Sequence, residues 1–144
     1  YKQCSGTGVH FSGNGYATPG WAVVSTSGPR REKDLWCSNC LYLLKLEPGD
    51  PKQPTVWRVA HTHCVNDPAI EKHYWAETHG AMDRYGKTIF FASNWDDFKA
   101  PIEAYRCDLP EGWYEHLMGA EKAKAVREKA AKTLGISVEE LVGK

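Results

Sequence analysis

The sequence predicts an α+β protein, and three patterns along its 144 residues support this prediction. A β-rich stretch around a tight turn, followed at once by the pair Cys37 and Cys40, indicates a small hairpin module at the front. Alternating apolar runs between residues 55 and 110 indicate a mixed α/β segment. From residue 111 onward apolar residues recur at spacings of three and four, which is typical of an amphipathic helix.

The composition is that of a neutral chain large enough for one compact domain with a small satellite. Eighteen basic and eighteen acidic residues cancel, so no overall field draws the chain to nucleic acid or to an anionic membrane. No run approaches the roughly 18 apolar residues that a membrane helix needs, and no signal-peptide pattern is visible near the start. We therefore expect a soluble, cytoplasmic protein.

The best linker is the stretch EPGDPKQP at residues 47–54, which contains three prolines and a glycine. It divides the chain into a module at 1–46, a mixed segment at 55–110 and C-terminal helices at 111–144.

Within the front module, residues 21–26 predict a strand, and residues 32–36 could return as its hairpin partner. Residues 4–20 are rich in glycine and predict tight turns. The run NCLYLLKL at 39–46 suits a short helix, with a strand as the alternative.

The middle segment contains signals for one helix and three strands. The predicted strands lie at residues 55–62, 87–93 and 102–109. A helix is predicted at 66–86, with Asp67 as its N-cap and Gly86 beyond its end. On this helix His73 and Glu77 are four residues apart and would meet as an ordinary pair.

The last segment predicts one long helix after Pro110. Its apolar stripe is formed by Trp113, Leu117, Ala120, Ala123, Val126, Ala130 and Leu134. Gly135 ends this helix, and Ser137 with Glu140 forms a capping box that starts a short terminal one.

The five cysteines are an odd set in a chain with no secretion signal, which favours metal ligands over a disulfide framework. Zinc requires about four ligands in a tetrahedron, and the C-x2-C pair Cys37 and Cys40 supplies two thiolates from one turn. Cys4 and His10, in the glycine-rich stretch upstream, supply the other two in our preferred assignment. Four protein ligands would make this site closed and structural.

The order of a cysteine knuckle, PGW at 19–21, a strand and CSNC at 37–40 resembles treble-clef or zinc-ribbon modules of actinobacterial and phage proteins. The resemblance covers about the first 46 residues and implies a zinc-stabilised, phage-related module located in a host cell or virion. The chain departs from the family pattern in its first knuckle, which is C-x5-H rather than C-x2-C.

A rival assignment completes the site from the cluster HTHC at 61–64, so that Cys37, Cys40, Cys64 and His61 or His63 bind zinc. A third interpretation has no metal, with Cys37 and Cys40 buried as small apolar residues.

The histidines of that cluster are candidates for chemistry of their own. Strand alternation places His61 and His63 on one face, where they could share proton transfer or stand as ordinary hydrogen-bonded residues. Cys64 beside either histidine could form a nucleophile pair, although no family signature surrounds it.

Residues 55–110 also show a fainter resemblance. The order of TVWRVAHT, IFFAS and AYRCDLP is similar to the strand order of ADP-ribosyltransferase and RNA 2′-phosphotransferase-like domains. The resemblance implies that Arg58 and His61 contact NAD. No catalytic glutamate can be placed, which counts against this interpretation.

The sequence thus favours a small, non-enzymatic zinc-binding accessory protein that binds another macromolecule, protein rather than nucleic acid. Trp21, Trp95 and Trp113 would be its anchors if exposed, or core residues if buried. The alternatives are an NAD-using transferase and a nucleic-acid adaptor that uses the hairpin tip at residues 28–33.

Overall fold

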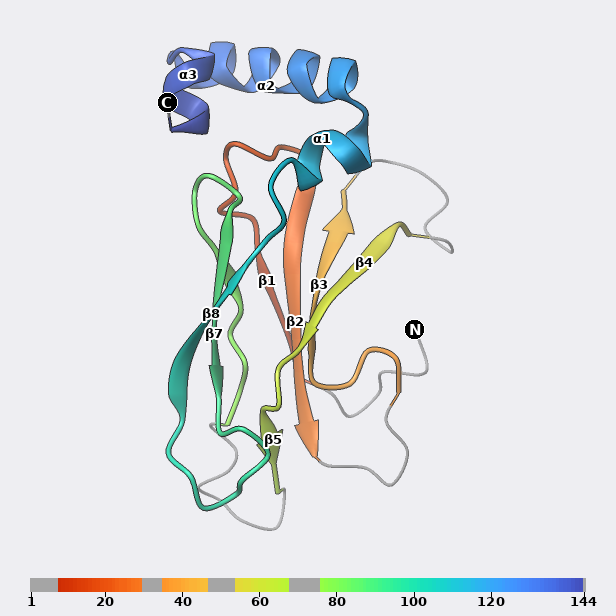
Figure 1. Ribbon diagram of the computed structural model, residues 1–144, viewed down its shortest axis with the longest axis vertical. Coiled ribbons are helices and arrows are strands. Elements are labelled where there is room, and N and C mark those ends of the chain that lie inside the picture. Colours follow the sequence, from red (N-terminus) through yellow and green to blue (C-terminus); the bar gives the residue numbers. More distant parts are fainter. Residues whose placement is uncertain (1–7, 30–34, 47–53, 68–75, 144) are drawn as a thin grey trace.

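The computed structural model describes residues 8–29, 35–46, 54–67 and 76–143. These residues form two β-sheets and three helices, and the helices gather at one end of the sheets (Figure 1). The α+β class predicted from the sequence is therefore confirmed. Stabilisation by zinc is a separate question and stays a prediction.

The larger sheet contains strands β1 to β4 in chain order, each antiparallel to its neighbour. These strands are β1 at Gly8–Ser12, β2 at Trp21–Pro29, β3 at Cys40–Lys45 and β4 at Val56–His61. A two-residue strand, β5 at Val65–Asn66, pairs in parallel with the end of β2. The strands predicted at 21–26 and 55–62 are confirmed, as their β-branched and aromatic residues indicated.

The smaller sheet is an antiparallel meander of β6 at Ala81–Met82, β7 at Thr88–Ser93 and β8 at Glu103–Asp108. The strands predicted at 87–93 and 102–109 are confirmed. Burial alternates along β7 because successive side chains point to opposite faces, so Ile89 is buried while Phe90 is exposed.

The two sheets and the first two helices share one hydrophobic core. Its buried members are Trp21, Val23, Leu41, Leu43, Met82, Ile89, Phe91, Trp113, Tyr114 and Ala123. Strands β3 and β4 pair directly although the predicted linker lies between them. One sheet and one core therefore run across the predicted boundaries between the front module, the mixed segment and the C-terminal helices.

The helices are α1 at Trp113–Met118, α2 at Ala120–Leu134 and α3 at Val138–Val142. The prediction of a single long helix after Pro110 is wrong. The helix is interrupted at Gly119, whose φ of 82° is not helical, and α1 and α2 lie on either side of it. No helix among the described residues has the length and hydropathy needed to cross a bilayer.

Both predicted helix-end signals are confirmed. Gly135 ends α2 in the left-handed conformation, with φ of 70°. The Oγ atom of Ser137 accepts a 3.0 Å hydrogen bond from the backbone N–H of Glu140, which starts α3.

Three predictions for the front module need correction. Residues 40–45 form a strand and no helix, since a short apolar run fits either structure until its pairing is known. The hairpin partner of β2 is this strand, while Leu35 and Trp36 lie in a turn and residues 32–34 fall outside the described part. Strand β1 also occupies residues that were expected to form turns only.

The helix predicted at 66–86 is wrong where the structure describes it. Residues 76–80 form an irregular stretch that leads into β6, and a turn follows at 84–87. The predicted partner of Glu77, His73, lies outside the described residues. Long-range bonds from residues 76–80 to β2 replace the local helical bonds that the sequence suggested.

Gly80 is where this stretch comes closest to β2 and β3. A Cβ atom at Gly80 would lie 2.8 Å from Leu41 Cδ2 and 2.9 Å from Ser25 Cβ. We expect Gly80→Ala to lower the free energy of unfolding by about 1–3 kcal/mol, because both neighbours are buried and have little room to move. Urea unfolding measures the change. Gly13→Ala is the matched control, since a Cβ there meets nothing within 4 Å, and equal stability of the two variants would contradict the prediction.

Candidate metal site

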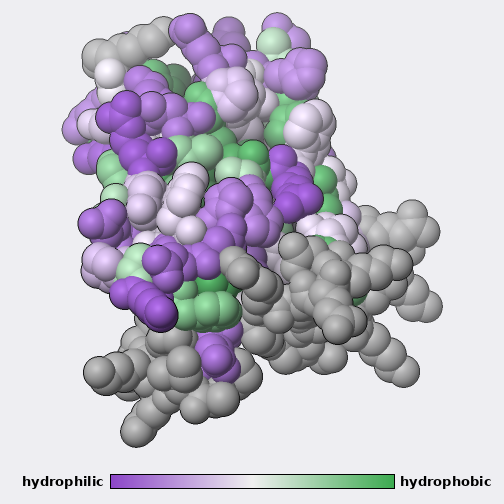
Figure 2. All heavy atoms as spheres, turned by 60° about the horizontal axis from the view of Figure 1, so that its bottom comes forward, coloured by the Kyte–Doolittle hydropathy of each residue, from purple (hydrophilic) through white to green (hydrophobic). Residues whose placement is uncertain are grey.

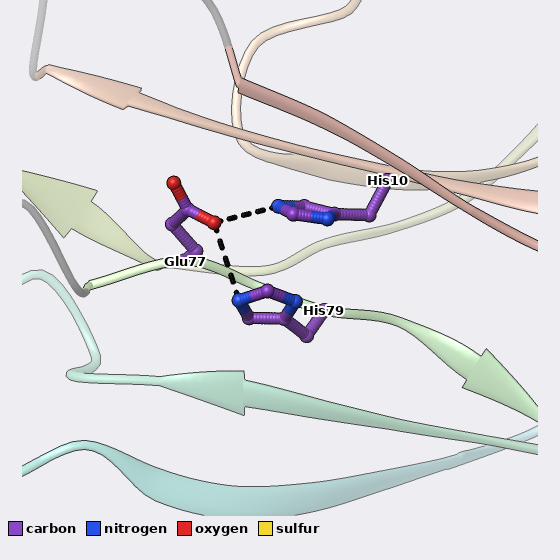
Figure 3. Close-up of side chains that lie close together, drawn as sticks. All are labelled: His10, Glu77 and His79. Atoms are coloured by element: carbon purple, nitrogen blue, oxygen red, sulfur yellow. Dashed lines mark hydrogen bonds and ion pairs between the residues drawn. The ribbon is translucent and has the colours of Figure 1, made fainter.

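Three potential metal ligands converge where β1 passes the stretch that precedes β6. Figure 3 shows His10 on β1 pointing toward Glu77 and His79. Within the described part of the chain, these are the residues of His, Cys, Asp or Glu type whose ligand atoms gather as a group of three, all within 4.8 Å of one another.

The carboxylate of Glu77 lies between the two imidazoles. Its Oε2 atom is 2.7 Å from His10 Nε2 and 3.2 Å from His79 Nε2. The two rings lie against each other with centroids 4.0 Å apart. The Glu77 and His10 side chains are 23% and 32% exposed and that of His79 is 60% exposed, so the site is open to solvent on one side.

Two hydrogen bonds anchor the irregular stretch that carries Glu77 and His79. Thr78 is buried and its hydroxyl donates to the carbonyl of Thr26 at 3.0 Å. The N–H of Gly80 donates to Ser25 Oγ at 2.8 Å. Thr78 is thereby held inward against β2, while Glu77 and His79 on either side of it face His10.

The backbone of His79 is in the left-handed region, with φ of 44°. Such a conformation costs a non-glycine residue about 1–3 kcal/mol and persists where the surroundings enforce it. Strain of this kind clusters at functional sites, which supports a functional role for the group of His10, Glu77 and His79.

Two imidazoles and one carboxylate are ligands that suit zinc. Two ligand atoms that each lie about 2.0–2.2 Å from a tetrahedral zinc ion are about 3.4 Å apart. The 3.2 Å separation of His79 Nε2 from Glu77 Oε2 is close to this value. The 2.7 Å separation at His10 would have to open by a little over half an ångström, a shift that a half-exposed side chain can make.

Among the described residues, the ligands of the preferred zinc assignment do not form a group of four. Cys37 is disulfide-bonded, and Cys4 lies outside the described residues. Cys40 is a free, buried thiol whose sulfur is 3.6 Å from Thr26 Oγ1. His10 is bonded to Glu77 instead. Zinc at Cys37 stays a prediction, and it requires the reduced form of that residue.

The rival assignment also depends on Cys37. Cys64 is a free, buried thiol, and burial raises its pKa, opposed by a hydrogen bond with the Thr78 side chain. Burial likewise raises the pKa of Cys40. Raised pKa values keep both thiols protonated in the metal-free protein, which disfavours a nucleophilic thiolate. His61 lies at the end of β4, opposite Cys40.

His63 belongs to a second polar cluster at the far end of the sheets from the helices. Its Nδ1 atom lies 2.6 Å from Asp96 Oδ2, and its ring is 4.5 Å from that of His61 and 4.7 Å from that of Trp95. His63, Trp95 and Asp96 all have positive φ values. The rings of His61 and His63 thus lie close together, but His63 lies beyond the end of β4 with a φ of 54°, so strand alternation does not bring it there.

The residues implied by the NAD resemblance share one face of β4. Arg58 pairs with Tyr42 and His61 with Cys40, and a register shift between these pairs brings both residues to the same side. NAD binding stays a prediction.

The three tryptophans singled out in the sequence divide into two groups. Trp21 and Trp113 are buried in the core and meet edge to face, with centroids 5.9 Å apart. Trp95 is 55% exposed and stacks on Tyr105 at 5.0 Å.

Comparisons of this chain with protein-family models, with curated proteins and with solved structures found no match. The geometry of the site is therefore the basis for its interpretation. Sequence reasoning identified His10 but missed Glu77 and His79. Their two-residue spacing would have placed them on one face of an extended segment, but a helix was predicted there.

Proposed function

We propose that this chain is a zinc-binding protein in which His10, Glu77 and His79 hold the ion. The supporting observation is that three ligand atoms come within 4.8 Å of one another from segments 67 residues apart in the chain. One carboxylate oxygen of Glu77 already lies beside both imidazoles, hydrogen-bonded to His10 and 3.2 Å from His79 Nε2, so the three ligand atoms need little rearrangement to take up an ion.

Three protein ligands leave at least one position for water or for a group of another molecule. The proposed site is therefore open, in contrast to the closed cysteine site predicted from the sequence. Zinc in such a site lowers the pKa of a bound water to about 7, which provides a nucleophile at neutral pH. The exposed imidazole of His79 marks the side from which another molecule would approach.

Titration of metal-free protein with zinc, followed by calorimetry, tests the proposal. We expect one zinc ion per chain in the wild type and at least a 100-fold loss of affinity in His79→Ala and in Glu77→Gln, since each removes one of three ligands. His116→Ala is the matched control, because His116 is an exposed histidine on α1 away from the group. Unchanged zinc binding in both ligand variants would refute the site.

Cobalt substitution separates this site from the two cysteine assignments. Thiolate ligands give cobalt(II) an intense charge-transfer absorption that imidazole and carboxylate ligands do not give. We expect the cobalt-loaded protein to lack this band, whereas a cysteine site would show it and the band would weaken in Cys40→Ser.

We also propose that the protein acts by binding another protein, as the sequence suggested. The exposed ring of Trp95 supports this role, because exposed tryptophans are frequent anchors of protein interfaces. The disulfide at Cys37 counts against the cytoplasmic location expected from the sequence, because such bonds persist mainly in oxidising compartments.

A further inference from the structure

Strand β1 is an outer strand of the larger sheet. Among the described strands its backbone pairs with β2 alone, in an unbroken register from Gly8 opposite Ser27 to Ser12 opposite Val23. Two of its side chains bond inward, His10 to Glu77 and Ser12 Oγ to the N–H of Met82. The ribbon in Figure 1 shows β1 beside β2 at one border of this sheet. Outer strands can template the addition of another strand, and proteins usually block this with charges, proline or irregular pairing.

The other outer strands carry such protection. Strand β4 contains Arg58 and pairs with β3 through a register shift. Strand β8 contains Glu103, Arg106 and Asp108. Strand β6 has only two residues. Strand β1, with the sequence GVHFS, has no charged residue, no proline and no register shift.

The side chains of β1 are arranged symmetrically about His10. Val9 and Phe11 lie on the outward face and are 41% and 67% exposed, while His10 points the opposite way toward Glu77. Read in either direction, the strand therefore presents a small residue, an apolar residue, His10, an apolar residue and a small residue. An antiparallel pair of two such strands matches apolar to apolar residues.

We propose that two copies of this chain pair through β1, antiparallel about a two-fold axis at His10, so that Val9 of each copy lies opposite Phe11 of the other. Pairs of an aromatic with a β-branched residue are among the favourable cross-strand pairs. The same strand meeting itself is the isologous contact expected of a two-fold dimer.

The occupant argued here is a second copy, because the pattern of β1 is complementary to itself, and charge does not oppose it. Strand β1 brings no formal charge to the contact, and the chain as a whole has a net charge of zero, so two identical molecules have no net repulsion. On the side shown in Figure 2, hydrophobic residues form scattered patches among hydrophilic ones, so the described surface there offers no broad apolar patch to compete with the strand edge.

Light scattering on the protein as it elutes from a sizing column tests this proposal. We expect the wild type to have twice the chain mass of 16.2 kDa, and Phe11→Lys to have the single chain mass, because a lysine on an outer strand opposes pairing. Phe90→Lys is the matched control, since Phe90 is 50% exposed on the central strand of the other sheet, and it should remain a dimer. Circular dichroism confirms that each variant is folded.

Amide hydrogen exchange locates the contact independently. The backbone amides of residues 8–12 should exchange more slowly in concentrated than in dilute wild-type protein, and this difference should vanish in Phe11→Lys. A monomeric wild type, a dimer that survives Phe11→Lys, or a dimer lost equally in both lysine variants would each overturn the proposal. Neither phenylalanine is a proposed zinc ligand, so this test stands whether or not zinc binds.

Discussion

Replacing Asn94 by alanine is expected to lower the free energy of unfolding by about 2–6 kcal/mol, because two buried backbone groups would lose their partners at once. The side-chain amide of Asn94 bonds both the N–H and the carbonyl of Val65 in β5, as the backbone of a neighbouring strand would. Its Oδ1 atom accepts from the N–H of Val65 at 3.0 Å, and its Nδ2 atom donates to the carbonyl of Val65 at 2.8 Å. Each buried backbone group left without a partner costs about 1–3 kcal/mol.

The effect should reach the second polar cluster, because Asn94 directly precedes Trp95 and Asp96. The N–H of Asp96 donates to the carbonyl of His63 at 2.7 Å, so residues 63–65 and residues 94–96 are joined at two points. Loss of one tie should loosen His63 and change the fluorescence of the exposed Trp95.

Urea unfolding gives the stability change, and hydrogen exchange at the Val65 amide gives its cause. Asn14→Ala is the control, since Asn14 is exposed and its substitution should change stability by no more than about 0.5 kcal/mol. If the Val65 amide stays as protected in Asn94→Ala as in the wild type, the role assigned to this side chain is incorrect.

Strands that follow local pattern could be predicted, whereas segments defined by distant partners could not. The β7 run from Thr88 to Ser93 has alternating burial and β-favouring residues, so its sequence alone identifies it. Residues 76–80 have no such local preference. Their bonds from Thr78 and Gly80 reach more than fifty positions back to β2, and helix signals near Asp67 misled the prediction.

The candidate metal site was hidden for the same reason. His10 was identified as a ligand, but Glu77 lies 67 positions away and joins it only because the folded chain brings that stretch beside β1. Likewise, the spacing of Cys37 and Cys40 fits a zinc knuckle, and spacing cannot show whether a sulfur is a thiolate ligand or part of a disulfide. The sequence shows which side chains are able to bind a metal, but only the folded structure shows which groups lie beside them.

The stability of the protein should fall in alkaline solution through two buried thiols. Cys40 and Cys64 have no exposed surface, and burial raises the pKa of each above the ordinary thiol value of 9.0. In the unfolded chain both thiols ionise near that ordinary value, while the folded chain still holds both protons. The folded state therefore binds more protons above about pH 9, and the free energy of unfolding decreases as pH rises.

Between the ordinary pKa and the raised pKa of the folded state, each thiol lowers the free energy of unfolding by about 1.4 kcal/mol per pH unit. Both together lower it by about 2.7 kcal/mol per pH unit. Well below the ordinary value both states are protonated, and these thiols cause no pH dependence. Urea unfolding from about pH 8 to pH 10 measures the slope, with recovery at neutral pH confirming that the disulfide at Cys37 has not rearranged. Cys40→Ala and Cys64→Ala should each reduce the slope by up to about 1.4 kcal/mol per pH unit.

The dependence of the free energy of unfolding on pH is a sharper test than its value at one pH, since replacing any buried residue changes that value. Ser38→Ala provides the comparison, because Ser38 is buried beside Cys37, accepts a hydrogen bond from the N–H of Leu35, and does not titrate in this range. It should lower stability equally at every pH and leave the slope unchanged. A slope that stays the same in both cysteine variants would show that these thiols ionise in the folded protein as readily as in the unfolded chain, and that burial does not hold their protons.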